Sequence, residues 1–163
     1  MKETPTTPDN FPHPLRILVA DDSVVFSKSL CAYLKSQPLI QVVGTAMDGG
    51  EALHMAELLG PDLILMDLRM PVVDGLQATA ILRHRVPNMR IIIMTIEDSV
   101  TAEAEARAHG AHGFIWKRRI INDLMTELGR AFSPDHTKDD RSSSPQNPIM
   151  THATQGQEGA ADQ

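Results

Sequence analysis

The stretch Leu63-Ile64-Leu65-Met66-Asp67 decides the fold, because four consecutive apolar residues end in a carboxylate. A short run with no polar residue on either face is typical of a central strand in a parallel sheet that is covered on both sides. Two other runs share this character, Ile17-Leu18-Val19 and Ile91-Ile92-Ile93-Met94. The sequence therefore predicts a buried parallel sheet with these runs at its centre.

Helical patterns alternate with the strands along the chain. Strands are expected at 15–20, 40–46, 63–66, 91–94 and 113–116, and helices at 24–34, 51–59, 74–84, 99–109 and 120–132. Five strand–helix repeats imply an α/β fold with helices on both faces of the sheet. Gln41 interrupts the second apolar run, which suits an edge strand. Gly60-Pro61 is expected to end the second helix, and Gly49-Gly50 is read as a turn because it lacks the residues of a phosphate loop.

Length and composition indicate one domain with polar flanks. The chain has 163 residues, of which 42% are apolar, enough for a real core. Residues 14–132 form the expected domain. Residues 1–13 and 133–163 are rich in polar residues and proline, and we expect both to be disordered, since they have little apolar surface to bury. No output domain is recognisable in 133–163.

Charge and cysteine content exclude several classes of protein. The net charge is −6, but only −2 falls within residues 14–132, so electrostatic binding to nucleic acid or to an anionic membrane is not expected. No apolar stretch is long enough to span a bilayer, and none resembles a signal peptide. Cys31 is the only cysteine, so no disulfide can form within the chain. These features together predict a cytoplasmic protein.

Polar residues follow the strands at the edge where ligands bind in open α/β sheets. Asp21-Asp22 follows the first strand, Asp67 the third, Thr95 the fourth and Lys117 the fifth. Three carboxylates repel one another unless a cation lies between them. Oxygen ligands of this kind suit Mg²⁺. An ordinary Asp has a pKa of about 3.9, so Asp67 should be ionised at neutral pH and able to attack phosphorus.

Each of these residues also has a simpler interpretation. Asp21 or Asp22 alone would most often cap the next helix, and Asp67 alone could cap a turn. Thr95 would be an ordinary residue at the end of a strand, and Lys117 a solvated lysine. The functional interpretation therefore depends on their joint placement at four strand ends.

Four segments resemble the receiver domains of two-component response regulators. They are 19–23 (VADDS), 66–75 (MDLRMPVVDG), 93–95 (IMT) and 110–117 (GAHGFIWK). The resemblance covers about residues 14–132. It implies a flavodoxin-like (βα)5 fold, with a five-stranded parallel sheet in the order 2-1-3-4-5.

The resemblance also implies roles for individual residues. Asp67 would accept a phosphoryl group from a histidine kinase or a histidine phosphotransfer protein. Asp22, Asp67 and the backbone carbonyl of Arg69 would bind Mg²⁺ directly, and Asp21 would do so through water. Thr95 and Lys117 would contact the phosphoryl group. Phe114 would be the aromatic switch that turns inward when Thr95 moves.

A surface for partners follows from the same resemblance. The segments 99–109, 113–116 and 120–132 would form the output surface, which binds a downstream protein target or a second copy of the chain. The protein would not be an enzyme beyond catalysing its own phosphorylation and dephosphorylation.

Several positions near the site vary within the family or depart from its pattern. Ile96 is larger than the small residue usual after the threonine, so it could crowd the phosphoryl group. Arg118 follows Lys117 where many receivers have proline, as in the subfamily with helix-turn-helix outputs. Arg69 and Glu97 flank the entrance, and our hypothesis is that they pair across it and restrict small phosphodonors.

Three alternative functions stay open at this point. The chain could be the receiver part of a DNA-binding transcriptional regulator. It could be a metal-dependent phosphatase with Asp67 as nucleophile, although Arg69 stands where such enzymes commonly have a second carboxylate. It could also be a receiver that no longer accepts phosphate and binds partners constitutively. Among the remaining residues, His109 and His112 are interpreted as surface residues at a helix end, and Cys31 as a packed, unreactive side chain.

Overall fold

The computed structural model describes residues 14–133, which contain five strands and five α-helices in strict alternation. The strands are β1 (Leu15–Ala20), β2 (Ile40–Ala46), β3 (Leu63–Asp67), β4 (Arg90–Thr95) and β5 (Gly113–Trp116). The helices are α1 (Val24–Lys35), α2 (Gly49–Leu59), α3 (Gly75–Arg85), α4 (Ala102–Ala108) and α5 (Ile120–Ala131), and a 3-10 turn, η1 (Lys117–Arg119), precedes α5. The predicted disorder of 1–13 and 134–163 lies outside the described residues.

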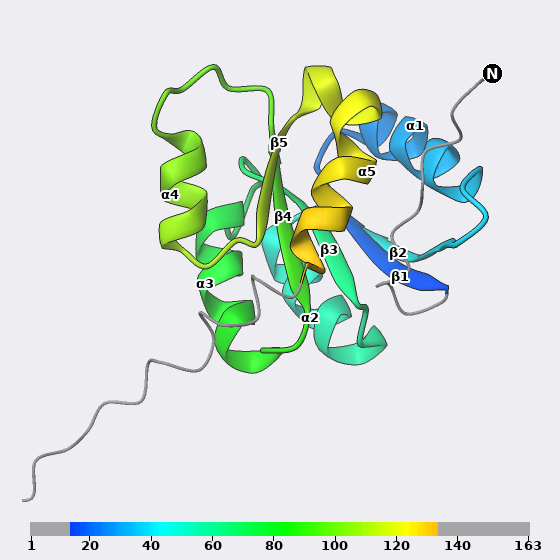
Figure 1. Cartoon of the computed structure of the whole chain (residues 1–163). Coiled ribbons are helices and arrows are strands. Elements are labelled where there is room, and N and C mark those ends of the chain that lie inside the picture. Colours follow the sequence, from blue (N-terminus) through cyan, green and yellow to red (C-terminus); the bar gives the residue numbers. More distant parts are fainter. Residues whose placement is uncertain (1–13, 134–163) are drawn as a thin grey trace, which may run out of the picture.

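The strands form one parallel sheet in the order β2-β1-β3-β4-β5, as the family resemblance implied (Figure 1). The three central strands are the apolar runs that predicted them, and every residue of β3 is buried. The second strand lies at the edge, as Gln41 indicated, and only its last residue is fully buried. The flavodoxin-like fold is therefore confirmed.

Helices cover both faces of the sheet, and alternate residues of each central strand point to opposite faces. Leu30 and Leu34 of α1 and Leu124 and Leu128 of α5 pack on one face. The other face is covered by α2, α3 and α4 through small or apolar residues such as Ala52, Ala78, Leu82 and Ala106. This arrangement leaves the carboxyl ends of the strands uncovered, since the helices lie on the faces.

The interpretation of Gly49-Gly50 as a turn was wrong, because both residues lie in the first turn of α2. The side chain of Asp48 caps this helix by accepting a hydrogen bond of 2.8 Å from the backbone N–H of Glu51. Gly49 is required by packing, since a Cβ atom there would lie 2.0 Å from the carbonyl oxygen of Val73. Gly60 ends the helix as predicted, in a left-handed conformation with φ 53°.

The fourth helix is shorter than predicted. It begins at Ala102, and neither Asp98 nor Ser99 caps it, because Thr101 holds the cap position without a side-chain hydrogen bond. Two exposed turn residues, Val100 and Thr101, thereby separate Ser99 from the helix.

The prediction that His112 lies on the surface was also wrong. It is 8% exposed, and its Nδ1 accepts a hydrogen bond of 3.0 Å from the backbone N–H of Ile91. His109 is exposed, as expected.

Candidate functional site: an acidic cavity at the carboxyl edge of the sheet

The structure brings the predicted polar residues together at one edge of the sheet. A cavity of about 420 Å³ lies there, lined by Asp22, Ser23, Phe26, Asp67, Arg69, Thr95, Ile96, Glu97 and Lys117. Four of the five strands, β1, β3, β4 and β5, supply their last residue or one of the two that follow, because parallel strands end at the same edge.

The acidic pair after β1 divides into a buried and an exposed residue. Asp21 is fully buried, and one of its oxygens, Oδ1, accepts a hydrogen bond of 2.9 Å from the backbone N–H of Ser23. Asp22 is exposed and lines the cavity. Neither aspartate caps α1, because Ser23 is its N-cap and accepts from the N–H of Phe26.

Asp67 ends β3 at the bottom of the cavity and is 5% exposed. After it, the N–H of Leu68 continues the pairing with β4 by donating to the carbonyl of Met94 at 2.8 Å, and the N–H of Gly75 closes the following loop by donating to the carbonyl of Leu68. A Cβ atom on Gly75 would lie 2.1 Å from the carbonyl oxygen of Asp67, so only glycine allows α3 to approach this closely. Gly75 thus lets α3 begin directly behind Asp67.

Lys117 follows β5 and links two of the carboxylates. Its Nζ lies 2.7 Å from Oδ2 of Asp21 and 3.0 Å from Oδ2 of Asp67, and its side chain is only 8% exposed. The ammonium group also lies over the ring of Phe26, 4.6 Å from the ring centroid. Sequence reasoning missed Phe26, although its position one helical turn after Asp22 was a usable signal.

Burial changes the electrostatics of Asp67 from what its sequence suggested. Burial raises the pKa of Asp67 to about 6, and Asp21 adds to this effect, while the Lys117 ammonium and the N–H of Arg69 oppose it. The expected pKa of about 3.9 was therefore too low. The carboxylate is still mostly ionised at pH 7, as its sequence position suggested.

Oxygen atoms of Asp21, Asp22 and Asp67 lie within 4.8 Å of one another, an arrangement typical of a Mg²⁺ site. One buried oxygen, Oδ2 of Asp21, has the Lys117 ion pair but no hydrogen bond of regular geometry. Three carboxylates face one ammonium group here, so the donor set fits a hard divalent cation. In the part of the chain that the structure describes, this is the only such group of acidic, histidine or cysteine side chains.

The remaining predicted residues surround this centre. Thr95 is 1% exposed, and its hydroxyl oxygen accepts a hydrogen bond of 3.0 Å from the N–H of Glu97. Phe114 is buried at 7% exposure and contacts Trp116 edge-on, with ring centroids 5.0 Å apart. Ile96 is 77% exposed at the rim, so its side chain does not fill the bottom of the cavity.

Arg69 and Glu97 form an ion pair at the entrance. The guanidinium donates to both carboxylate oxygens, with the shorter contact, Nε to Oε1, at 2.7 Å. Arg118, which stands where many receivers have proline, lies in η1, pairs with Asp98 at 3.2 Å and lies over the ring of Trp116.

The profile of the "Response regulator receiver domain" matches residues 17–129. The chain belongs to this family. The receiver covers nearly all of the described residues, and its acidic centre of Asp21, Asp22 and Asp67 lies at the carboxyl edge of the sheet.

Relatives of this receiver include regulators and the receiver parts of enzymes. It is 32% identical over 116 residues to the transcriptional regulatory protein LnrK of Bacillus subtilis, covering 69% of this chain and 53% of LnrK. It is 41% identical over 97 residues to protein-glutamate methylesterase/protein-glutamine glutaminase 4 of Myxococcus xanthus, covering 58% of this chain and 28% of that protein. The chain thus spans about half, or less, of the length of these curated relatives.

Solved structures show the same fold. The response regulator domain of Thermotoga maritima CheB is 32% identical, with a TM-score of 0.67, and the match covers 72% of this chain and 96% of that domain. The receiver domain of the putative response regulator NarL from Mycobacterium tuberculosis is 29% identical, with a TM-score of 0.65 over 80% of this chain and 99% of that one. Among residues 14–133, no helix is both long enough and apolar enough to cross a membrane.

Proposed function

We propose that this receiver accepts a phosphoryl group on Asp67 from the phosphohistidine of a histidine kinase or a histidine phosphotransfer protein. The observation that carries the proposal is the buried contact of Lys117 with Asp67, at 3.0 Å, beside two further carboxylates. An ionised carboxylate held at the bottom of a cavity can attack phosphorus without a separate base. The P–N bond to the donor histidine breaks as the O–P bond to Asp67 forms.

The residues around Asp67 have separate tasks in this proposal. Asp22, Asp67 and the carbonyl of Arg69 would hold Mg²⁺ directly, and Asp21 would hold it through water. When bound, Mg²⁺ supplies positive charge that offsets the negative charge of the phosphoryl oxygens. The side chain of Lys117 is only 8% exposed, and its ammonium group lies 3.0 Å from Oδ2 of Asp67. It therefore provides a fixed cation for one of these oxygens. The Thr95 hydroxyl, which accepts from Glu97 in this structure, would turn to donate to another.

Movement of Thr95 would carry the signal to the surface. Thr95 lies opposite Trp116 in the pairing of β4 with β5, and Phe114 lies two residues earlier in the same strand. A shift of Thr95 toward the phosphoryl group would therefore alter the packing of these aromatic rings. The surface formed by α4, β5 and α5 would then bind a downstream protein target or a second copy of the receiver.

Phosphorylation can be tested by intact mass after incubation with a small phosphodonor and Mg²⁺. The native chain should gain one phosphoryl group, which hydroxylamine removes, and Asp67→Ala should gain none. Asp98→Ala, which removes an exposed aspartate outside the acidic centre, serves as the matched control and should be phosphorylated like the native chain. No gain from either a small donor or a phosphohistidine protein would exclude Asp67 as an acceptor and favour a constitutive binding module.

A second candidate function is supported by the relatives. LnrK is a transcriptional regulatory protein, and the alignment covers only 53% of it. The chain could thus act as the receiver part of a DNA-binding regulator. The mass of the protein in its native cells distinguishes the two, because a DNA-binding regulator requires a second domain.

A further inference from the structure

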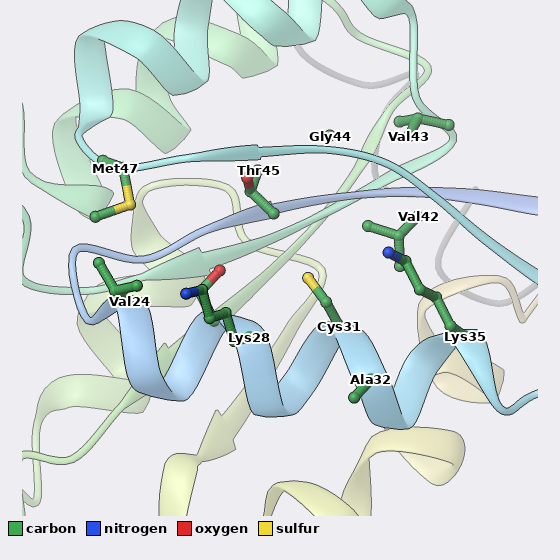
Figure 2. Close-up of a pocket in the computed structure, with 11 residues that line it drawn as sticks. Val24, Lys28, Cys31, Ala32, Lys35, Val42, Val43, Gly44, Thr45 and Met47 are labelled. Carbon is green, nitrogen blue, oxygen red and sulfur yellow. The ribbon is translucent and has the colours of Figure 1, made fainter.

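A second cavity, of about 540 Å³, lies between α1 and the edge strand β2 and shares no lining residue with the acidic site. Figure 2 shows that Lys28, Cys31 and Lys35 project from α1 toward β2, where Val42 points back at the helix. Cys31 and Val42 belong to the apolar core on this face of the sheet and give the groove an apolar part, beside the hydroxyl-bearing residues Ser27 and Thr45 of its lining.

The groove is positively charged although the chain as a whole carries a net charge of −6. Lys28 and Lys35 are both exposed, and no carboxylate lines the cavity. Within residues 14–133, neither ammonium group has an acidic partner. Burial raises the pKa of the Cys31 thiol, and the Ser27 hydrogen bond and the nearby Lys35 ammonium oppose this effect. The groove therefore favours an anionic ligand with an apolar part.

One wall of the groove is a strand with an open side. Among the described residues β2 pairs only with β1, so the backbone groups on its other side have no partner in the sheet. A strand of seven residues with a free edge can accept an added strand, which is a common mode of peptide binding. A small anion would use the lysines but not this edge.

The two lysines lie within reach of one extended chain. Lys28 and Lys35 are two helical turns apart, or about 10 Å along α1. Side chains on one face of a strand recur every second residue, or about 7 Å, and both lysine side chains are long and exposed, so two acidic side chains on the face toward α1 could each reach one lysine. The apolar side chains between them would point to the opposite face, on the side of Val43, which packs against the other core of the sheet.

From the charge, the free edge and this spacing, we propose that the groove between α1 and β2 binds an extended acidic segment of a partner protein as an added strand. The partner is defined by its chemistry: alternating acidic and apolar residues, with the acidic side chains facing α1. This interaction does not depend on the phosphorylation of Asp67.

The probe for this proposal is a fluorescein-labelled peptide of alternating Glu and Val, with fluorescence polarisation of the full chain as the measurement. We expect Lys28→Glu with Lys35→Glu to weaken binding at least about tenfold, because each acidic side chain loses its cation and meets a like charge. Arg85→Glu with Arg107→Glu is the control, since it changes the net charge equally at exposed ion pairs outside the groove. Asp67→Ala should bind like the native chain.

A second pair of probes tests the added strand. The same peptide with N-methyl groups on alternate backbone nitrogens keeps its charge but cannot pair along one edge, so its affinity should fall at least about tenfold. Equal binding of both peptides would overturn strand addition and leave a site for small anions. Equal losses in both double variants would show that only net charge matters.

Two other results would also overturn the proposal. If no acidic peptide binds, the lysines only protect the edge from unwanted pairing, a common role of charge beside edge strands. In a variant whose acidic residues beyond 133 are neutralised, the peptide could bind at least about tenfold more tightly than to the native chain. That result would mean that the chain's own acidic segment competes with the peptide and is the natural occupant of the groove. The residues replaced by Asn or Gln in that variant are Asp135, Asp139, Asp140, Glu158 and Asp162.

Discussion

The bottom and the rim of the acidic cavity use charge in opposite ways. At the bottom, the side chains of Asp21, Asp67 and Lys117 are at most 8% exposed and share two ion pairs. At the rim, Arg69 and Glu97 make an ion pair with an equally short contact, but their side chains are 68% and 37% exposed. Buried charges interact strongly and cost much to leave unpaired, whereas water screens exposed pairs. The bottom should therefore control stability and chemistry, and the rim only access.

Removal of the buried cation is the change with the largest expected effect on stability. Lys117→Met leaves Asp21 and Asp67 buried beside each other without a positive partner, so we expect a loss of about 3 kcal/mol in the free energy of unfolding at pH 7. The loss should shrink toward pH 5, because protonation of Asp67, whose pKa is raised to about 6, relieves the repulsion. Urea unfolding in EDTA at both pH values measures this.

Lys35→Met, which removes an exposed lysine on α1, is the control for this variant and should change stability little at either pH. A loss for Lys117→Met that is the same at pH 7 and pH 5 would contradict the electrostatic explanation and indicate lost packing against Phe26.

Neutralising Asp67 should have the opposite sign. Its pKa is about 6 in the folded protein and near 3.8 when unfolded, so its charge costs stability in the absence of metal, and this cost grows as pH rises from about 4 to 6. Asp67→Asn should therefore raise the free energy of unfolding at pH 7 by about 1–2 kcal/mol. This is less than the full difference between the two pKa values corresponds to, because the folded carboxylate keeps part of its contact with water. The gain should disappear near pH 4, where the native aspartate is already protonated.

Thermal unfolding with EDTA or Mg²⁺ tests the same variant. Added Mg²⁺ should stabilise the native chain more than Asp67→Asn, because the variant lacks one charged ligand. Asp22→Asn changes an exposed carboxylate and should show the weakened response to Mg²⁺ without the gain in EDTA. A gain for both variants would mean that net charge, and not burial, explains the effect.

Backbone strain in the loop between β3 and α3 gives a smaller effect. Val72, in the loop between β3 and α3, has φ 71° and is 84% exposed, a conformation that is costly for a β-branched residue. Val72→Gly should stabilise the protein by about 1 kcal/mol, because the relief of strain exceeds the entropy that glycine adds to the unfolded chain. Val100→Gly, at an equally exposed loop position without a positive φ, should not stabilise it. Equal effects on urea unfolding would rule out strain at Val72.

The difference between bottom and rim also limits what the sequence could predict. The apolar runs that end at Asp67 and Thr95 predicted the parallel sheet, because strands with no polar residue on either face must be covered on both faces. Parallel strands end together, so Asp21, Asp67, Thr95 and Lys117 could be placed at one edge before any coordinates were known. These predictions needed only the period and order of the elements.

Features that depend on how one element packs against another were missed. The contact of Phe26 with Lys117 and the burial of His112 depend on the orientation of side chains in the folded chain. Gly49 was misread because the signal that begins α2 lies in the side chains of Asp48 and Glu51, while the need for glycine comes from Val73 in a distant loop. The raised pKa of Asp67 likewise depends on burial, which no local pattern specifies.

The smallest effect on stability, but a clear one on rate, is expected at the ion pair of the rim. Arg69→Ala opens the entrance above Asp67 and keeps the backbone carbonyl that would bind Mg²⁺. Since the Arg69 side chain is largely exposed, the free energy of unfolding should be nearly unchanged. Arg107→Ala, which breaks an exposed ion pair on α4, is the control and should also leave it nearly unchanged. Phosphorylation by a small phosphodonor, monitored through the fluorescence of Trp116, should be several-fold faster in Arg69→Ala than in the native chain. Arg107→Ala should keep the native rate. An unchanged rate would show that the pair does not restrict access, and a slower one would show that Arg69 instead attracts the anionic donor to the cavity.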